Sequence, residues 1–99
     1  MAKVYVPYNI MEFAKRKGPN VVRLVNKVAG WADKGGKSIV GGTAIGKNYS
    51  TLILDMRYNG SEIYINLDNG EVQLFGEVVN SPKSFLKVLN QNTSELVGV

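Results

Sequence analysis

The fold is decided by one continuous stretch, TLILDMRYNGSEIYINLDNGEVQLFGEV, which spans residues 51–78. It contains the dipeptide Asn-Gly twice, at residues 59–60 and 69–70. Asn-Gly is the strongest signal for a two-residue hairpin turn, because both central residues of that turn need positive φ. The segments beside the turns alternate apolar with polar residues, as half-buried strands do. We therefore predict a three-stranded antiparallel meander with strands at about 51–58, 61–67 and 71–78.

The two turns can be tested against each other, because each one fixes the register of the strands that it joins. A two-residue first turn pairs Leu54 with Ile65, and a two-residue second turn pairs Ile65 with Leu74. Apolar residues then share one face in all three strands. A slip of one residue at either turn would move them to opposite faces. This agreement supports the meander.

A short strand and two helices are predicted before the meander. Residues 3–6 alternate like a strand and are followed by a proline. Asn9 can cap a first helix that the Gly-Pro pair at 18–19 ends, and Asn20 can cap a second helix. The second helix has apolar residues at helical spacing, which we expect to form its core face: Val21, Leu24, Val25, Val28 and Ala32.

Two segments of the chain are less determined by their sequence. Residues 35–48 contain five glycines and fit either a short hairpin turning at Gly41-Gly42 or a mobile loop. After the meander, Ser81 can cap a short C-terminal helix at about 82–90, with Pro82 at its first position. We expect residues 91–99 to form a loosely ordered tail. The 99 residues are thus expected to form a single α+β domain, 1–99.

The composition excludes several kinds of chemistry. The chain has no cysteine and no histidine, which removes disulfides, thiolate zinc sites and imidazole bases. The fragment at 36–38, Gly-Lys-Ser, is not a phosphate-binding loop, because Trp31 occupies the position of that motif's first glycine. We therefore expect no enzymatic activity, no metal and no other cofactor.

There is no apolar run of membrane-spanning length and no signal-peptide pattern at the start, so we expect a cytoplasmic protein without membrane contact.

Charge is divided unevenly along the chain. Residues 1–50 contain nine basic and two acidic residues, a net charge of +7, whereas residues 51–99 have a net charge of −3. This asymmetry predicts an electropositive face that binds DNA or RNA through its phosphates. A solvated basic surface that only aids solubility is the alternative. The candidate phosphate-binding residues are Lys15, Arg16, Lys17, Arg23, Lys27, Lys34, Lys37 and Lys47.

A second hypothesis concerns the polar face of the predicted meander. The predicted register places Tyr64 directly opposite Phe75, with Ile53 diagonally beside Tyr64. These three residues form a candidate interface for a protein partner or a homodimer. The sequence leaves open two other roles, a base-stacking platform and a face covered by another segment.

The predicted order helix–strand–strand–strand–helix resembles that of double-stranded RNA-binding domains. In that family a first helix, a loop and the start of the last helix contact phosphates. The resemblance would give Lys83 and Lys87 the last of these roles. It extends to element order only, because the family's other sequence landmarks are absent. Small inhibitor proteins of phages and mobile elements also have meander-plus-helix folds, which is consistent with the interaction hypothesis.

Overall fold

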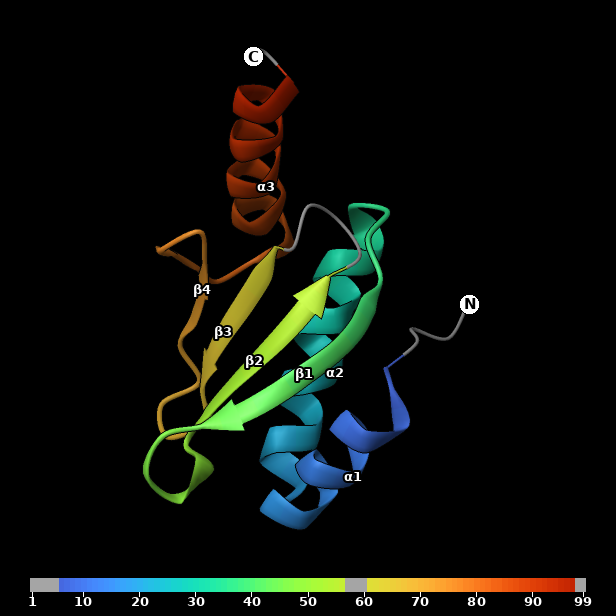
Figure 1. The fold of residues 1–99 in the computed structure, drawn as a ribbon, viewed down its shortest axis with the longest axis vertical. Helices are drawn as coiled ribbons and strands as arrows, with labels where there is room; N and C mark the ends of the chain where they lie inside the picture. The colour runs from blue at the N-terminus through green and yellow to red at the C-terminus, as the bar shows by residue number, and fades with distance from the viewer. Residues whose placement is uncertain (1–5, 57–60, 98–99) are drawn as a thin grey trace.

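The computed structural model describes the backbone of residues 6–56 and 61–97, with side chains up to residue 91 (Figure 1). Two helices precede an antiparallel sheet, and a third helix follows it. The α+β class predicted from the sequence is therefore confirmed, with more strands than expected. The elements are α1 (Tyr8–Lys17), α2 (Pro19–Lys34), β1 (Ile39–Ile45), the 3-10 turn η1 (Lys47–Tyr49), β2 (Thr51–Met56), β3 (Glu62–Asn66), β4 (Val72–Leu74), β5 (Glu77–Val79) and α3 (Pro82–Val97).

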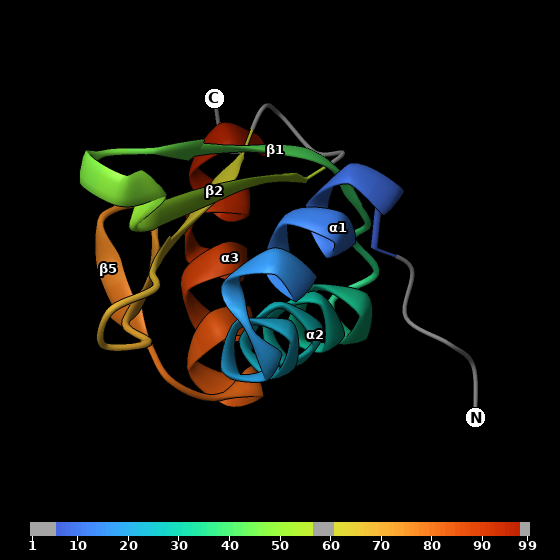
Figure 2. The same ribbon diagram turned by 90° about the horizontal axis from the view of Figure 1, so that it is seen from below.

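The five described strands form one sheet in the order β1-β2-β3-β4-β5, and each strand pairs antiparallel with the next. All three helices lie on the same side of this sheet (Figure 2). We call the side that faces the helices the inner face and the other side the outer face. The two faces therefore have different environments, as expected for an antiparallel sheet with one face in solvent.

The core lies between the inner face and the helices α2 and α3. Strand β2 alternates buried and half-buried residues along its whole length, and its buried residues point to the helices. Four of the five apolar residues predicted to face the core from α2 are buried, and Leu24 is half-buried. Across the core, the ring of Trp31 in α2 lies 6.1 Å from the ring of Phe85 in α3. This aromatic contact joins the two helices.

The strand register differs from the predicted one by two residues. Leu54 pairs with Ile63, and Ile63 pairs with Leu74. The loop after β3 explains the second shift, because it has four residues instead of two and is closed by a hydrogen bond from Asn66 N to Glu71 O, 2.8 Å. The Asn66 side chain accepts the backbone N–H of Asp68 at 2.9 Å, which stabilises this longer loop. The apolar face survives, because a shift of two residues preserves the side to which each side chain points.

The third predicted strand, 71–78, is divided into β4 and β5 by a tight turn. The turn consists of Phe75 (φ 52°) and Gly76 (φ 79°), and Leu74 pairs with Glu77 across it. Positive φ at both central residues is the geometry of a type I′ hairpin. Phe75 is therefore in a turn and does not face Tyr64, whose partner on β4 is Gln73. The predicted aromatic pair is wrong.

Residues 39–45 form neither of the two structures expected of them. They make the single strand β1, which runs antiparallel to β2 through both Gly41 and Gly42, with an irregularity between Ile39 and Gly41. A hairpin turning at these glycines is thus excluded, and so is a mobile loop. Glycine is needed here for a different reason: a Cβ on Gly42 would lie 2.7 Å from the backbone oxygen of Ile53.

The ends of the helices also differ from prediction. Pro7 and Gly18 precede the first turns of α1 and α2, so Asn9 and Asn20 lie inside the helices and cap neither. Pro19 is accepted in the first turn of α2 because that position needs no N–H donor. The C-terminal helix α3 continues past residue 90 to Val97. The strand predicted at 3–6 falls mostly outside the described residues.

Candidate nucleic-acid interface

The end of α1 and the start of α2 place their basic residues next to each other. A single residue, Gly18, separates the two helices, and its φ of 136° reverses the chain. The last turn of α1 carries three exposed cations, Lys15, Arg16 and Lys17. Lys15 and Arg23 line the same shallow groove between the helices, together with Pro19 and Val22. The structure thus brings α1 and α2 cations onto one surface.

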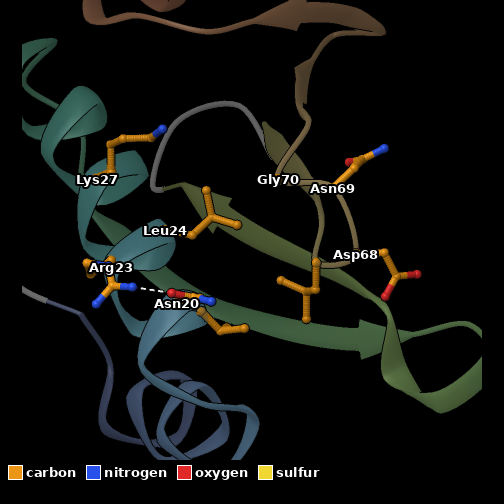
Figure 3. Close-up of a pocket in the computed structure, with 9 residues that line it drawn as sticks. Asn20, Arg23, Leu24, Lys27, Asp68, Asn69 and Gly70 are labelled. Atoms are coloured by element: carbon orange, nitrogen blue, oxygen red, sulfur yellow. Dashed lines mark hydrogen bonds between the residues drawn. The ribbon is translucent and has the colours of Figure 1, made fainter.

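A second groove lies between α2 and the loop after β3 (Figure 3). It has a volume of about 350 Å³ and is open to solvent. Arg23 and Lys27 line it from α2, and Asp68 and Asn69 line it from the loop. The guanidinium of Arg23 donates a hydrogen bond to Asn20 Oδ1, which orients the side chain along the helix. Arg23 therefore lines both grooves and joins the cations of the first groove to those of the second.

Lys17 connects this surface to the turn between β1 and β2. Its Nζ donates a hydrogen bond of 2.5 Å to the backbone oxygen of Asn48 and lies 5.8 Å from the centre of the Phe13 ring. Lys47 is the neighbour of Asn48 in the chain and is exposed. The structure therefore adds Lys47 to the α1 cations, although 30 residues separate them in the sequence.

Two of the eight predicted cations lie elsewhere. Lys34 ends α2, eleven residues after Arg23, and Lys37 follows that helix. At 1.5 Å per residue, Lys34 is roughly 16 Å from Arg23 along the helix axis. We therefore define the basic surface by the remaining six residues, Lys15, Arg16, Lys17, Arg23, Lys27 and Lys47, all of which are exposed.

Aromatic side chains near these cations have two different environments. Trp31 is buried, and Lys27 Nζ lies 5.4 Å from its ring centre. Trp31 therefore belongs to the core. Tyr49, next to Lys47 and Asn48, is 62% exposed. Sequence reasoning missed it, although a tyrosine two residues from a lysine in a polar turn was a usable signal.

The outer face of the sheet is not covered by any helix in the described part of the chain (Figure 2). Ile53 pairs with Tyr64, and Tyr64 pairs with Gln73, which pairs with Val78 of β5. Gln73 occupies the position opposite Tyr64 that the sequence predicted for Phe75. Val78, on β5 beyond Gln73, is 58% exposed. Asp55 pairs with Glu62 on the same face, so the face is acidic as well as partly apolar.

The outer face also carries a tyrosine, Tyr64, whose phenol has a raised pKa. Its hydroxyl donates a hydrogen bond of 3.1 Å to Glu62 Oε1. That hydrogen bond, followed by the negative charge of Glu62, raises the pKa of Tyr64, because both favour the protonated phenol. The side chain is exposed, so the shift marks a local contact and not a reactive site.

A cluster of metal ligands and a membrane-spanning helix are both absent from the described part of the chain. Within residues 6–56 and 61–91, no three side chains are grouped to hold a metal ion. None of the helices described is both long and apolar enough to cross a membrane. Comparison with known proteins finds no family model, no curated protein and no solved structure that matches this chain. Charge and geometry are therefore the basis for any functional assignment.

Proposed function

We propose that this protein binds DNA or RNA by contacting phosphates with its basic surface. The position of Arg23 carries the proposal, because this side chain lines two grooves at once and connects the cations of α1 with those of α2. Arginine presents a planar fork of donors that matches the oxygens of a phosphate. Contacts to phosphates position a protein on nucleic acid without reading its bases, so we propose binding that depends weakly on base sequence.

The expected strength of this binding follows from counterion release. The logarithm of the binding constant falls linearly with the logarithm of the salt concentration. For a duplex in contact with about five of the six cations, the slope of this line (the salt slope) should be about −4 to −5. Within the described residues, no carboxylate forms an ion pair with Arg23 or Lys27, so these two cations are available to a ligand. Asp68, on the far side of the groove in Figure 3, disfavours a phosphate close to the loop. Phosphates should therefore lie nearer α2.

The double variant Arg23→Ala/Lys27→Ala tests the proposal. We expect it to weaken binding of a fluorescein-labelled 20-base-pair duplex by about tenfold at 100 mM salt, and to reduce the magnitude of the salt slope by about 2. Fluorescence anisotropy from 50 to 200 mM salt measures both quantities. The matched control is Lys34→Ala/Lys87→Ala, which removes the same charge at exposed positions outside the basic surface.

Two outcomes would contradict the proposal. If the unmodified protein shows no salt-sensitive binding to single-stranded or duplex oligonucleotides at 50 mM salt, the function is wrong. If the control variant loses as much affinity as the Arg23 and Lys27 variant, binding depends on net charge alone and the basic surface is not the site.

The outer face of the sheet favours a second candidate function, docking of a protein. Tyr64 and Val78 are both exposed and are joined across the sheet by Gln73, which pairs with each of them. The acidic pair Asp55 and Glu62 lies beside them. A partner with a basic surface fits this face, and a second copy of this chain carries such a surface on its helical side. Light scattering over a concentration series at low and high salt tests the second-copy case. Salt-sensitive association that Tyr64→Ala/Val78→Ser abolishes, with the circular dichroism spectrum unchanged, would support it, and a monomer throughout would contradict it.

A further inference from the structure

The turn between β1 and β2 holds a tyrosine in an unusual backbone conformation. Asn48 (φ 58°) and Tyr49 (φ 53°) both lie in the left-handed region, and so does Gly46 (φ 85°). This conformation is uncommon for any residue with a side chain and rarer still for a bulky one. Such conformations persist where the surroundings fix them, and they concentrate at binding sites. Here the conformation directs a 62% exposed aromatic ring into solvent.

One hydrogen bond closes this turn, and two others fix it to the rest of the molecule. Tyr49 N donates to Gly46 O at 3.0 Å within the turn, and Leu67 N donates to Ser50 O at 2.8 Å from the end of β3. The third is the bond from Lys17 Nζ to Asn48 O, which comes from α1. Tyr49 is therefore held at one edge of the basic surface, with Lys17 bonded to the preceding residue and Lys47 two residues before it.

We propose that Tyr49 stacks on an unpaired base, so that the preferred ligand of the basic surface is single-stranded nucleic acid. This inference rests on the proposed function, because the cations supply the phosphate contacts that bring a base to the ring. Proteins that bind single strands combine a cationic surface with exposed aromatic rings, on which any base can stack. In a duplex the bases are stacked on each other, so Tyr49 has no base to contact there.

The other exposed aromatic residues that the structure describes lack this setting, and one of them, Tyr64, lies on the acidic outer face of the sheet. Tyr8 is 78% exposed but begins α1, nine residues before Lys17, which places it roughly 13 Å from Lys17 along the helix axis. Phe75 is 40% exposed and lies in the turn between β4 and β5. Tyr8 therefore provides a matched control: it is an exposed tyrosine of the same chain, distant from the bound strand.

The experiment compares Tyr49→Ala, Tyr49→Phe and Tyr8→Ala by fluorescence anisotropy. The probes are a labelled dT20 strand and a labelled 20-base-pair duplex at 100 mM salt. We expect Tyr49→Ala to weaken binding of dT20 by about tenfold, the effect of losing one stacked base. Its binding to the duplex should change by less than about twofold, because stacking contributes nothing there. Tyr49→Phe keeps the ring and should bind dT20 nearly as the unmodified protein does, as should Tyr8→Ala.

Failure of this inference is distinguishable from failure of the proposed function. If Arg23→Ala/Lys27→Ala weakens binding as expected while Tyr49→Ala binds dT20 as tightly as Tyr8→Ala does, only the stacking role is wrong. Equal losses on dT20 and duplex for Tyr49→Ala would also overturn it, since they indicate a role in placing Lys17 or Lys47. If the unmodified protein binds neither probe, the proposed function fails and the stacking role fails with it. Circular dichroism confirms that each variant is folded.

Discussion

Replacing Phe85 with alanine should lower the free energy of unfolding by about 3–5 kcal/mol. Phe85 is fully buried at the start of α3, and its ring meets that of Trp31 at 6.1 Å and 48°. The loss combines transfer of the ring from water, a cavity between α2 and α3, and about 0.5–1.5 kcal/mol from the aromatic pair. Since domains of this size have about 5–15 kcal/mol of stability in all, the variant should be severely weakened.

Urea denaturation followed by circular dichroism measures this loss. Each kcal/mol corresponds to about 4–8 °C in the melting temperature of a domain this small, so the thermal midpoint should fall by more than about 12 °C. If Phe85→Ala does not fold, Phe85→Leu gives a smaller loss that can be measured, about 1–2 kcal/mol. Lys87→Ala, exposed on the same helix, is the control and should change stability by less than about 0.5 kcal/mol. A loss below 1 kcal/mol for Phe85→Ala would contradict the packing of α3 on α2.

The sequence predicted the two faces of the sheet better than the pairing of its strands. Alternation of apolar and polar residues depends only on whether a position is odd or even, so Ile63 and Ile65 are buried in the predicted and the observed register alike. The length of a loop decides the pairing itself. That length depended on the Asn66 side chain, whose oxygen accepts the backbone N–H groups of Asp68 and Asn69. Asn-Gly at 69–70 suggested a shorter turn and gave no sign of this contact.

A positive φ was harder to predict at residue types that rarely adopt one. Positive φ is expected of glycine or asparagine, so a type I′ turn with Phe75 at its first central position had no sequence signal. The third strand was consequently predicted as continuous. The same reason hid the backbone conformation of Tyr49, whose neighbours Asn48 and Ser50 are hydrogen-bonded to α1 and to the end of β3. Tertiary contacts of this kind are not encoded in any local pattern.

The candidate site was partly predictable because α1 and α2 are neighbours in the chain. Lys15 and Arg23 are separated by one short connection, so a shared surface followed from the two helices alone. Lys47 joined that surface only through the contact between Lys17 and Asn48, which crosses from one helix to a distant turn. Lys34 lies on α2 with Arg23 and Lys27, but its distance of roughly 16 Å from Arg23 along the helix axis excluded it from the basic surface. Angular position and axial position both decide whether helical residues form one site.

Replacing Gly42 with alanine is the second substitution with a large expected effect. A Cβ at this position would lie 2.7 Å from the backbone oxygen of Ile53 and 2.7 Å from Ile10 Cδ1. The isoleucine side chain can rotate away, but the carbonyl belongs to the neighbouring strand β2 and cannot move without disturbing the sheet. We therefore expect a loss of about 1–3 kcal/mol in the free energy of unfolding, from overpacking where β1, β2 and α1 meet.

The adjacent Gly41 gives a matched control for this prediction. Among the described residues, the one atom within 4 Å of its Cβ would be Asp55 Oδ2, at 3.8 Å, which is an ordinary contact on the outer face. Gly41→Ala should leave stability unchanged or raise it by up to about 1 kcal/mol, because alanine restricts the unfolded chain. Urea denaturation of the two variants compares the inner with the outer face at consecutive residues of one strand. Equal effects of the two substitutions would show that β1 does not lie against Ile10 and Ile53 as described, since neither the sequence nor β-propensity distinguishes two neighbouring glycines.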